Sequence, residues 1–237
     1  MNQTPELVSA IEQLYRTFAS YQLHENTDAC PCCHSSQDEE RLHRKELRQL
    51  NAHDLEQYAM DALFVWGGVY DFKHFIPRIF ELSVTCGDDF LDPEMIFNKL
   101  HYGEWRTWPE PEQLAVERFF GALWYCVLDN PTHKMYGDEI EGWLCGIAQA
   151  VSDLSPYLGV WLITETENAY LNLARFIAET DFAKPNYRPF AFWEGRADLF
   201  DEVVAWVRSD AVKSRLAKIA AQYSQYDFVE RAYTLLC

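Results

Sequence analysis

The sequence has no long apolar run. None of its 237 residues falls in a window that approaches the ~18 uninterrupted apolar residues of a membrane-spanning helix. The first residues, MNQTPELVSAIEQ, also lack the basic start and the apolar core of a secretory signal. We therefore expect a cytoplasmic protein that does not associate with a membrane.

Positive charge is scarce. The chain carries 20 Lys and Arg against 37 Asp and Glu, which gives a formal net charge of -17. Because nucleic-acid binding depends on clusters of cations that displace counterions, we expect no nucleic-acid partner. An acidic surface suits a basic protein partner, so one hypothesis is an acidic antagonist of a basic protein; plain solubility is the commoner reason for such a charge.

The motifs of the commonest enzyme classes are absent. The sequence has no glycine-rich phosphate loop, no Gly-x-Ser-x-Gly nucleophile motif and no His-Glu-x-x-His metal motif. Neighbouring carboxylates are abundant in so acidic a chain and therefore indicate nothing about catalysis. The sequence favours a protein without catalysis of its own over an enzyme.

What the sequence does contain is helical periodicity, with 49% hydrophobic residues to fill a core. Apolar residues recur at three- and four-residue spacing, and no stretch alternates apolar and polar residues for long, so we predict an all-α fold. The expected helices cover residues 5–21, 38–50, 55–66, 72–84, 93–100, 112–128, 138–154, 156–163, 165–180, 197–207 and 211–236, the last with a break near Gln225.

Short connections rich in Gly, Pro, Asp and Asn favour an irregular stack of antiparallel helical hairpins, with a compact orthogonal helical bundle as the alternative. We expect one domain over residues 1–237. The polar stretch 182–188 is either an ordered surface loop or the division between two lobes. Oligomeric state is not indicated, because the many aromatic residues suit a core and an interface equally.

Three of the seven cysteines lie within four positions, in the sequence CPCC at residues 30–33. An odd total does not fit a secreted disulfide framework, so we expect free or metal-bound thiols in a reducing compartment. The two-residue gap between Cys30 and Cys33 suits two ligands of one zinc ion, but no second pair follows at the usual distance. The predicted zinc ligands are Cys30, Cys33, His34 and His24, with Cys32 and His43 as substitutes.

Three interpretations of this loop remain open. Four protein ligands would make a structural zinc site, whereas an open coordination position would indicate a metal-dependent enzyme or a metal-responsive protein. Unligated thiols are the second interpretation. A thioredoxin-type redox site is the third, but it requires a strand before the cysteines, and the sequence predicts none.

Two further segments combine charged and aromatic residues: 71–78, where a helix is expected to begin, and 102–109, just before a long helix. Asp71 is expected to cap the first helix, with Lys73 at the edge of its buried face. The aromatic residues of the second segment suit either a binding surface or the attachment of a loop to a helix. The candidate polar and aromatic surface consists of Asp71, His74, Arg78, Trp105, Arg106 and Trp108.

The run LRQLNAHDLEQYAMDALFVWGGVYDFKHFIPRIFEL, followed by KLHYGEWRTWP, resembles a group of uncharacterised bacterial proteins. The resemblance covers the first half of the chain well. It implies a helical, cytoplasmic protein with a Cys-x-x-Cys pair, matched here by Cys30 and Cys33, and it supplies no activity or catalytic residue. Many packed helices, strong acidity and the missing catalytic motifs favour an interaction or scaffold protein, and the resemblance implies a bacterial source.

Overall fold

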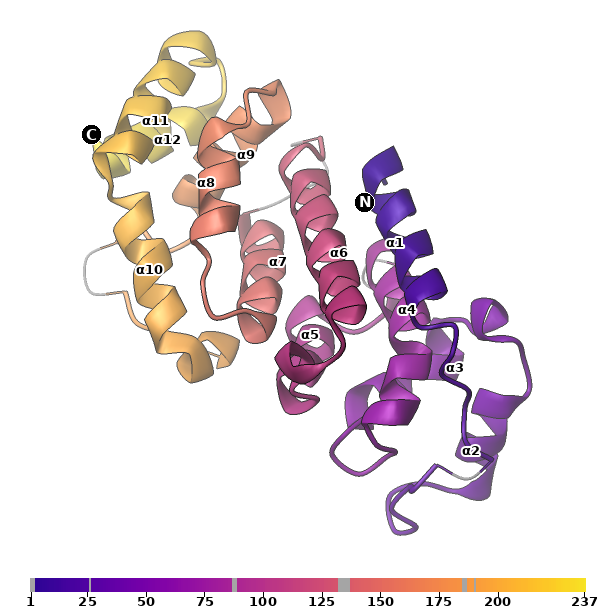
Figure 1. Cartoon of the computed structure of the whole chain (residues 1–237). Helices are drawn as coiled ribbons and strands as arrows, with labels where there is room; N and C mark the ends of the chain where they lie inside the picture. The colour runs from indigo at the N-terminus through magenta and orange to yellow at the C-terminus, as the bar shows by residue number, and fades with distance from the viewer. Residues whose placement is uncertain (1–2, 26, 87–88, 132–136, 185–186, 190) are drawn as a thin grey trace. The chain divides into compact units, whose positions relative to one another are not determined.

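The computed structural model of the chain describes residues 3–25, 27–86, 89–131, 137–184, 187–189 and 191–237 (Figure 1). Within these ranges the secondary structure is twelve α-helices with short 3-10 helices, and β-type pairing is confined to isolated bridges. The all-α prediction is therefore confirmed. In the part of the chain that is described, no helix combines the length and the apolar character needed to cross a bilayer.

The described chain divides into two compact units, residues 3–122 and 123–237. The boundary falls inside a long helix, α6 (Glu110–Leu128), and not at 182–188, which lies within the second unit. There Phe182 is fully buried and its ring stacks on Phe176 at 5.3 Å. The described part of 182–188 thus contributes to a core, and the single-domain organisation stays a prediction.

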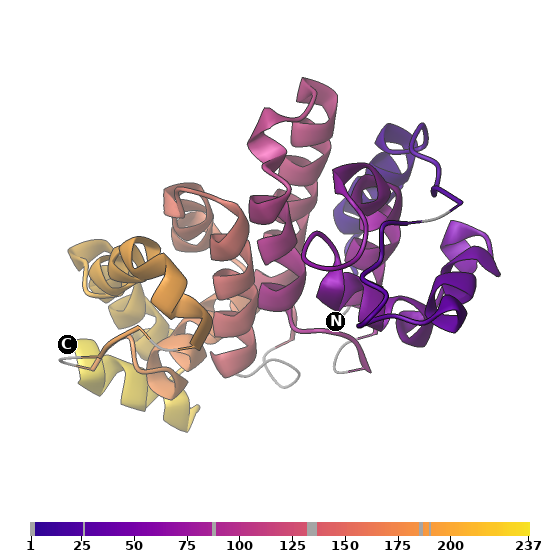
Figure 2. The same cartoon turned by 90° about the horizontal axis from the view of Figure 1, so that it is seen from below.

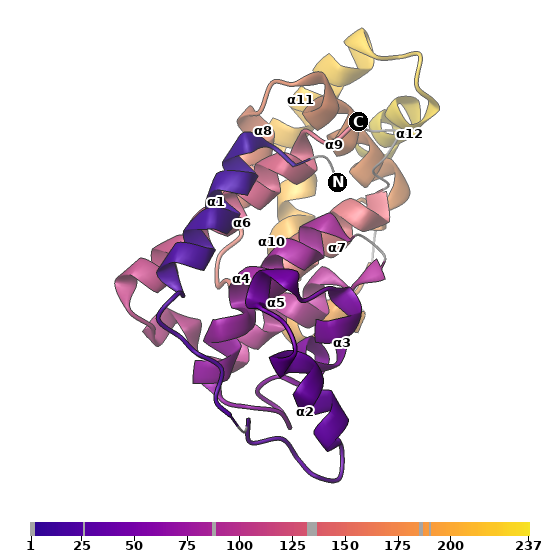
Figure 3. The same ribbon diagram turned by 90° about the vertical axis from the view of Figure 1, so that its right-hand side faces the viewer.

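The first unit contains the N-terminal helices and the first part of α6. Helices α1 and α4 pack side by side, and α4 also contacts α3 and α5 (Figure 3). Its elements are α1 (Pro5–Thr17), α2 (Ser36–His43), η1 (Leu47–Gln49), α3 (Ala52–Asp61), α4 (Val69–Thr85), α5 (Pro93–Tyr102) and η3 (Trp105–Thr107).

The core of the first unit is aromatic. The rings of Phe80, Phe97, Phe119 and Phe120 lie 4.8 to 6.2 Å apart, and all four side chains are buried. Edge-on and tilted ring pairs of this kind stabilise a core beyond the area they bury. These residues come from α4, α5 and α6, so the core joins three elements that are distant in sequence.

Three predicted helices of the first unit are shorter than expected, and the first of them, 5–21, ends at Thr17. The predicted helix 38–50 is interrupted: α2 ends at His43, and the chain continues as the separate 3-10 turn η1. The predicted helix 55–66 ends at Asp61, since Leu63 adopts a positive φ of 68° and Trp66 pairs with Ala29 in an antiparallel bridge. The apolar residues of 62–66 have helical spacing, but in the structure they belong to a non-helical segment that is bridged to Ala29.

The second unit is built around α9, which contacts α7, α11 and α12 (Figures 1 and 2). Asn172 of α9 is fully buried, and its amide donates hydrogen bonds to the carbonyl oxygens of Leu128 and Asn130, both at 2.9 Å. The elements of this unit are α7 (Gly137–Ala150), α8 (Ser155–Ile163), α9 (Glu167–Glu179), η5 (Ala191–Arg196), α10 (Ala197–Val207), α11 (Asp210–Gln222) and α12 (Asp227–Leu236).

Candidate metal centre

The cysteine loop, residues 27–34, lies between α1 and α2 in the first unit and is attached to the segment that follows α3. The backbone N–H of Cys30 donates to the carbonyl oxygen of Val65 at 2.8 Å, and the backbone N–H of Gly67 donates to the backbone carbonyl oxygen of Asp28 at 3.4 Å. Gly67 has a φ of +69°, and a Cβ there would lie 3.3 Å from the Asp71 side chain. The backbone conformation and the close approach of Asp71 therefore favour glycine at position 67.

The carboxylate of Glu39 anchors Thr27, the first residue of the cysteine loop, by hydrogen bonds. Glu39 of α2 accepts hydrogen bonds from the backbone N–H of Thr27 at 2.8 Å and from its hydroxyl at 2.6 Å. The indole N–H of Trp66 contacts the same Glu39 carboxylate at 3.1 Å and the Thr27 hydroxyl oxygen at 2.6 Å. Thr27 and Trp66 are both buried. The loop is therefore fixed to α2 and to the bridge by one polar network.

The three thiols of the loop gather on a tight turn. The backbone N–H groups of Cys33 and His34 both donate to the carbonyl oxygen of Cys30 at 3.0 Å. The Sγ of Cys32 lies 2.8 Å from that of Cys30 and 3.7 Å from that of Cys33. Within the described ranges, these residues form the one group of three or more potential metal ligands whose donor atoms all lie within 4.8 Å of one another.

These distances are close to those of a metal thiolate site. A Zn–S bond of about 2.3 Å in a tetrahedron puts two sulfur ligands roughly 3.8 Å apart. The separation between Cys32 and Cys33 already matches that edge, while the 2.8 Å between Cys30 and Cys32 has to widen by about 1 Å. The three thiols thus lie close enough together to bind a metal ion.

The thiols differ in acidity because they share hydrogen bonds. The pKa of Cys30 is lowered, chiefly because the thiol of Cys32 donates to its sulfur. The pKa of Cys33 is raised to about 11 by hydrogen bonding to Cys32 and Cys30 and by their negative charge. Cys32 and Cys33 are exposed and Cys30 is half-buried, so an ion can reach all three from solvent.

The predicted histidine ligands lie outside this group. His24 Nδ1 is 2.7 Å from the Asp71 carboxylate, and its ring stacks on Tyr70 at 4.6 Å. His43 Nε2 lies 3.6 Å from Glu39. Both imidazoles are therefore engaged by carboxylates, whereas the substitute ligand Cys32 lies between the two predicted cysteines.

His34 follows the thiols directly but faces the protein interior. Its side chain is 2% exposed, and its ring packs on Trp66 at a centroid distance of 4.2 Å. Neither ring nitrogen makes a hydrogen bond with a described residue, and the nearest carboxylate, Asp61, is 3.5 Å from Nε2. In this arrangement His34 packs between the loop and Trp66 and does not join the three thiols as a fourth ligand.

The polar residues of the first charged segment, 71–78, make hydrogen bonds within the first unit. Helix α4 begins at Val69, before Asp71 and not at it as predicted; from the third helical position Asp71 accepts from the backbone N–H of the N-cap residue Gly68 at 3.2 Å. His74 Nδ1 lies 2.9 Å from the carbonyl oxygen of Tyr21, and burial lowers the pKa of its imidazole. Arg78 donates to the carbonyl oxygen of Leu50 at 2.6 Å.

The second segment attaches a loop to a helix. The indole N–H of Trp108 donates to the carbonyl oxygen of Gly103 at 2.8 Å, and Trp105 is also buried. The guanidinium of Arg106 stacks over Trp105 at 3.9 Å and pairs with Glu117 of α6. The six residues predicted as one surface are therefore engaged separately in the first unit.

A buried ion pair is the feature that sequence reasoning missed. Lys73, expected at the edge of its helix, is buried, and its ammonium lies 2.7 Å from the Glu112 carboxylate. Tyr21 donates to the same carboxylate at 2.6 Å, and the Trp108 ring centroid is 4.5 Å from the ammonium. No sequence signal linked these residues, since Tyr21, Lys73 and Glu112 are widely separated in the chain.

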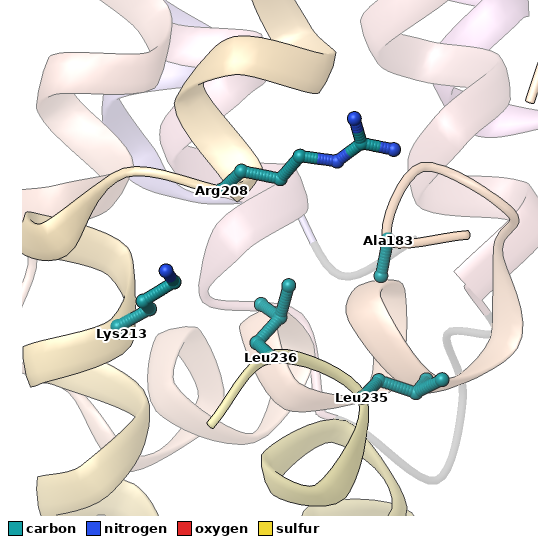
Figure 4. A pocket seen from close by; sticks show the side chains of 5 residues that line it. All are labelled: Ala183, Arg208, Lys213, Leu235 and Leu236. Atoms are coloured by element: carbon teal, nitrogen blue, oxygen red, sulfur yellow. The ribbon is translucent and has the colours of Figure 1, made fainter. Parts of the chain in front are cut away.

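A shallow pocket of about 470 Å³ adjoins the cysteine loop, and Cys30, Phe64, Val65 and Trp66 are among the residues that line it. Another, of about 270 Å³, lies in the second unit (Figure 4). Its lining combines the cations Arg208 and Lys213 with Leu235, Leu236 and Ala183. This second pocket contains none of the predicted site residues.

Comparison with known proteins adds no relative. No family model matches the chain, and neither a curated protein nor a solved structure matches it. The resemblance to uncharacterised bacterial proteins thus stays a prediction. Fold and site together define an all-α protein with a three-thiol cluster on an anchored loop.

Proposed function

We propose that the protein binds a zinc ion through Cys30, Cys32 and Cys33, and that it is a metal-responsive interaction protein without catalysis of its own. The observation that carries the proposal is the mutual approach of the three sulfur atoms, all within 4.8 Å on one anchored turn. Thiolates are the preferred ligands of zinc and other soft ions.

The surroundings of the thiols favour exchange of the ion. Cys32 and Cys33 are exposed, and the described residues supply no fourth donor within the same 4.8 Å. Structural zinc sites have four protein ligands, whereas a site with three keeps a position open. A protein that gains and loses its ion with supply fits this arrangement, and a reducing cytoplasm would keep the thiols available.

The response to metal would be an ordering of the thiol turn. The loop is anchored at Thr27 and Cys30, while the turn beyond them holds the two exposed cysteines. Metal binding replaces hydrogen bonds among thiols by metal–sulfur bonds and so fixes the turn. Exposed aromatic residues nearby, Phe64 and Tyr102, with ring centroids 4.5 Å apart, offer a surface through which a partner would sense that change.

The test is elemental analysis of protein purified without chelator, followed by titration of apo protein with zinc. We expect one zinc per chain, and loss of the ion in each of Cys30→Ser, Cys32→Ser and Cys33→Ser. Cys237→Ser, an exposed cysteine in the second unit, is the matched control and should retain the ion. A parent protein that neither contains nor takes up zinc would overturn the proposal.

His34→Gln distinguishes the ligand sets. If three thiolates hold the ion, this variant keeps the full stoichiometry, because His34 lies against Trp66 and not in the thiol group. Loss of the ion in His34→Gln would instead indicate that the loop rearranges to place four protein ligands around a structural zinc.

A further inference from the structure

The chemistry of the fourth coordination position follows from what surrounds the thiols. Each candidate imidazole of this loop region is placed elsewhere: His24 on Asp71, His43 on Glu39 and His34 on Trp66. A zinc ion on three thiolates still prefers a fourth ligand. Among the described residues that ligand is not at hand, so another molecule can supply it.

The pocket beside Cys30 gives that molecule a place. It is lined by residues 28–30 and 64–67, two segments joined by backbone hydrogen bonds, and Cys30 is one of these residues, so the pocket lies beside the proposed ion. Phe64, which is 51% exposed, and Val65 are apolar residues of this lining. A ligand that reaches the ion from this side therefore places its remaining atoms against apolar surface.

Charge selects the type of donor atom. Three thiolates and one Zn²⁺ leave one net negative charge, and Asp28, which is among the residues that line the pocket, carries a second one. The ammonium of Lys99 lies over the Phe64 ring, but it is buried and donates to the carbonyl oxygen of Met60. A thiolate or a carboxylate would bring a further negative charge to the thiols and Asp28, in a chain whose net charge is already -17. A neutral imidazole coordinates zinc without adding charge.

From these observations we infer that the fourth ligand of the ion is an imidazole supplied by a partner protein: a histidine flanked by an apolar residue that packs on Phe64. The inference rests on the proposed zinc site and names the chemistry of its partner. The histidine nitrogen takes the coordination position that solvent would otherwise hold. The adjacent apolar group is buried against Phe64, which ties partner binding to the presence of metal.

The test uses the whole protein loaded with Co²⁺, whose visible absorption reports the ligands of the ion. Imidazole and 4-phenylimidazole are titrated into the loaded protein, with thiocyanate as a singly charged anion of small size. We expect both imidazoles to change the spectrum at one equivalent per site. The phenyl compound should bind about tenfold more tightly, since its ring packs on Phe64.

Phe64→Ala is the decisive variant. It should bind imidazole as the parent does but lose the tenfold preference for the phenyl compound. Tyr125→Ala, an exposed aromatic residue of the second unit, is the matched control and should keep the preference. Because Phe64 is exposed, we expect Phe64→Ala to fold, and thermal melting of both variants verifies that they are folded.

Three outcomes would overturn the inference. They are a cobalt spectrum that neither imidazole alters, tighter binding of thiocyanate than of imidazole, and a phenyl preference that survives Phe64→Ala. Each leaves the zinc site itself standing, because cobalt has bound. Failure of the protein to bind cobalt or zinc at all would overturn the proposed function and this inference together.

Discussion

The backbone N–H of Cys30 lies 2.8 Å from the carbonyl oxygen of Val65, so the first thiol of the loop is attached to the segment behind α3. This hydrogen bond joins two segments more than thirty positions apart. It holds Cys30 while Cys32 and Cys33 stay exposed on the turn. The stability of the bridged segment should therefore control the metal affinity of the loop.

Gly67→Ala tests that control. The substitution forces an alanine into a positive φ of 69° with its Cβ 3.3 Å from Asp71. We expect a loss of about 1–3 kcal/mol in the free energy of unfolding, with weaker zinc binding. Gly159→Ala in α8 is the control, because nothing lies within 4 Å of its new Cβ; it should stabilise the protein by up to ~1 kcal/mol. Urea unfolding measures the stability of the two variants, and equal stabilities would contradict the argument.

Glu39→Ala tests the network under the loop. It removes the acceptor for Thr27 and leaves the buried backbone N–H of that residue without its carboxylate. We expect a loss of about 2–3 kcal/mol, as for hydrogen bonds to a charged group. Glu40→Ala, which removes an exposed pair with Arg44, should change stability by less than ~0.5 kcal/mol. Similar losses in the two variants would refute the anchoring role.

Lys73→Met tests the buried ion pair. It leaves the Glu112 carboxylate buried without its cation, so we expect a loss of roughly 3–5 kcal/mol in the free energy of unfolding. The double variant Lys73→Met with Glu112→Leu removes both charges and should recover most of that loss. Chemical denaturation of the single and double variants provides the measurement. A double variant no more stable than the single one would show that the pair is not the source.

Lys99 should make stability depend on pH. Its side chain is buried over Phe64 and donates to the carbonyl oxygen of Met60, and burial lowers the pKa of its ammonium to about 8. The unfolded chain, with an ordinary lysine pKa of about 10.4, binds more protons between these values. The free energy of unfolding of the parent should therefore rise from pH 8 to pH 10 relative to that of Lys99→Met. Parallel pH profiles of the two proteins would contradict the shifted pKa.

The helices were predictable where one apolar face decides the structure. Residues 197–207 were expected as a helix, and α10 has those bounds; the expected break near Gln225 separates α11 from α12. The period failed at residues 62–66, where Trp66 is buried against His34 and Tyr58 although it lies in a bridged segment and not on a helix. A local pattern records that a side chain is buried, not which distant segment buries it.

The site was predictable in part for the same reason. The density of cysteines at residues 30–33 marked the loop, because proximity in sequence ensures proximity in space. The histidine ligands could not be ranked, since their neighbours are distant in sequence: Asp71 lies 47 positions from His24. Glu39 and Lys73 carried no local signal, because a helical carboxylate or ammonium in an acidic chain is usually solvated.

The position of Trp66 gives the loop an optical reporter of its own. Its indole N–H is bonded to Thr27 and Glu39, while its ring faces His34, so both anchor and turn contact one fluorophore. A change in the turn alters the polarity and the quenching groups around that ring. Emission compared between the parent and Trp66→Phe would thus follow occupancy of the thiols in real time, without a dye attached to the chain.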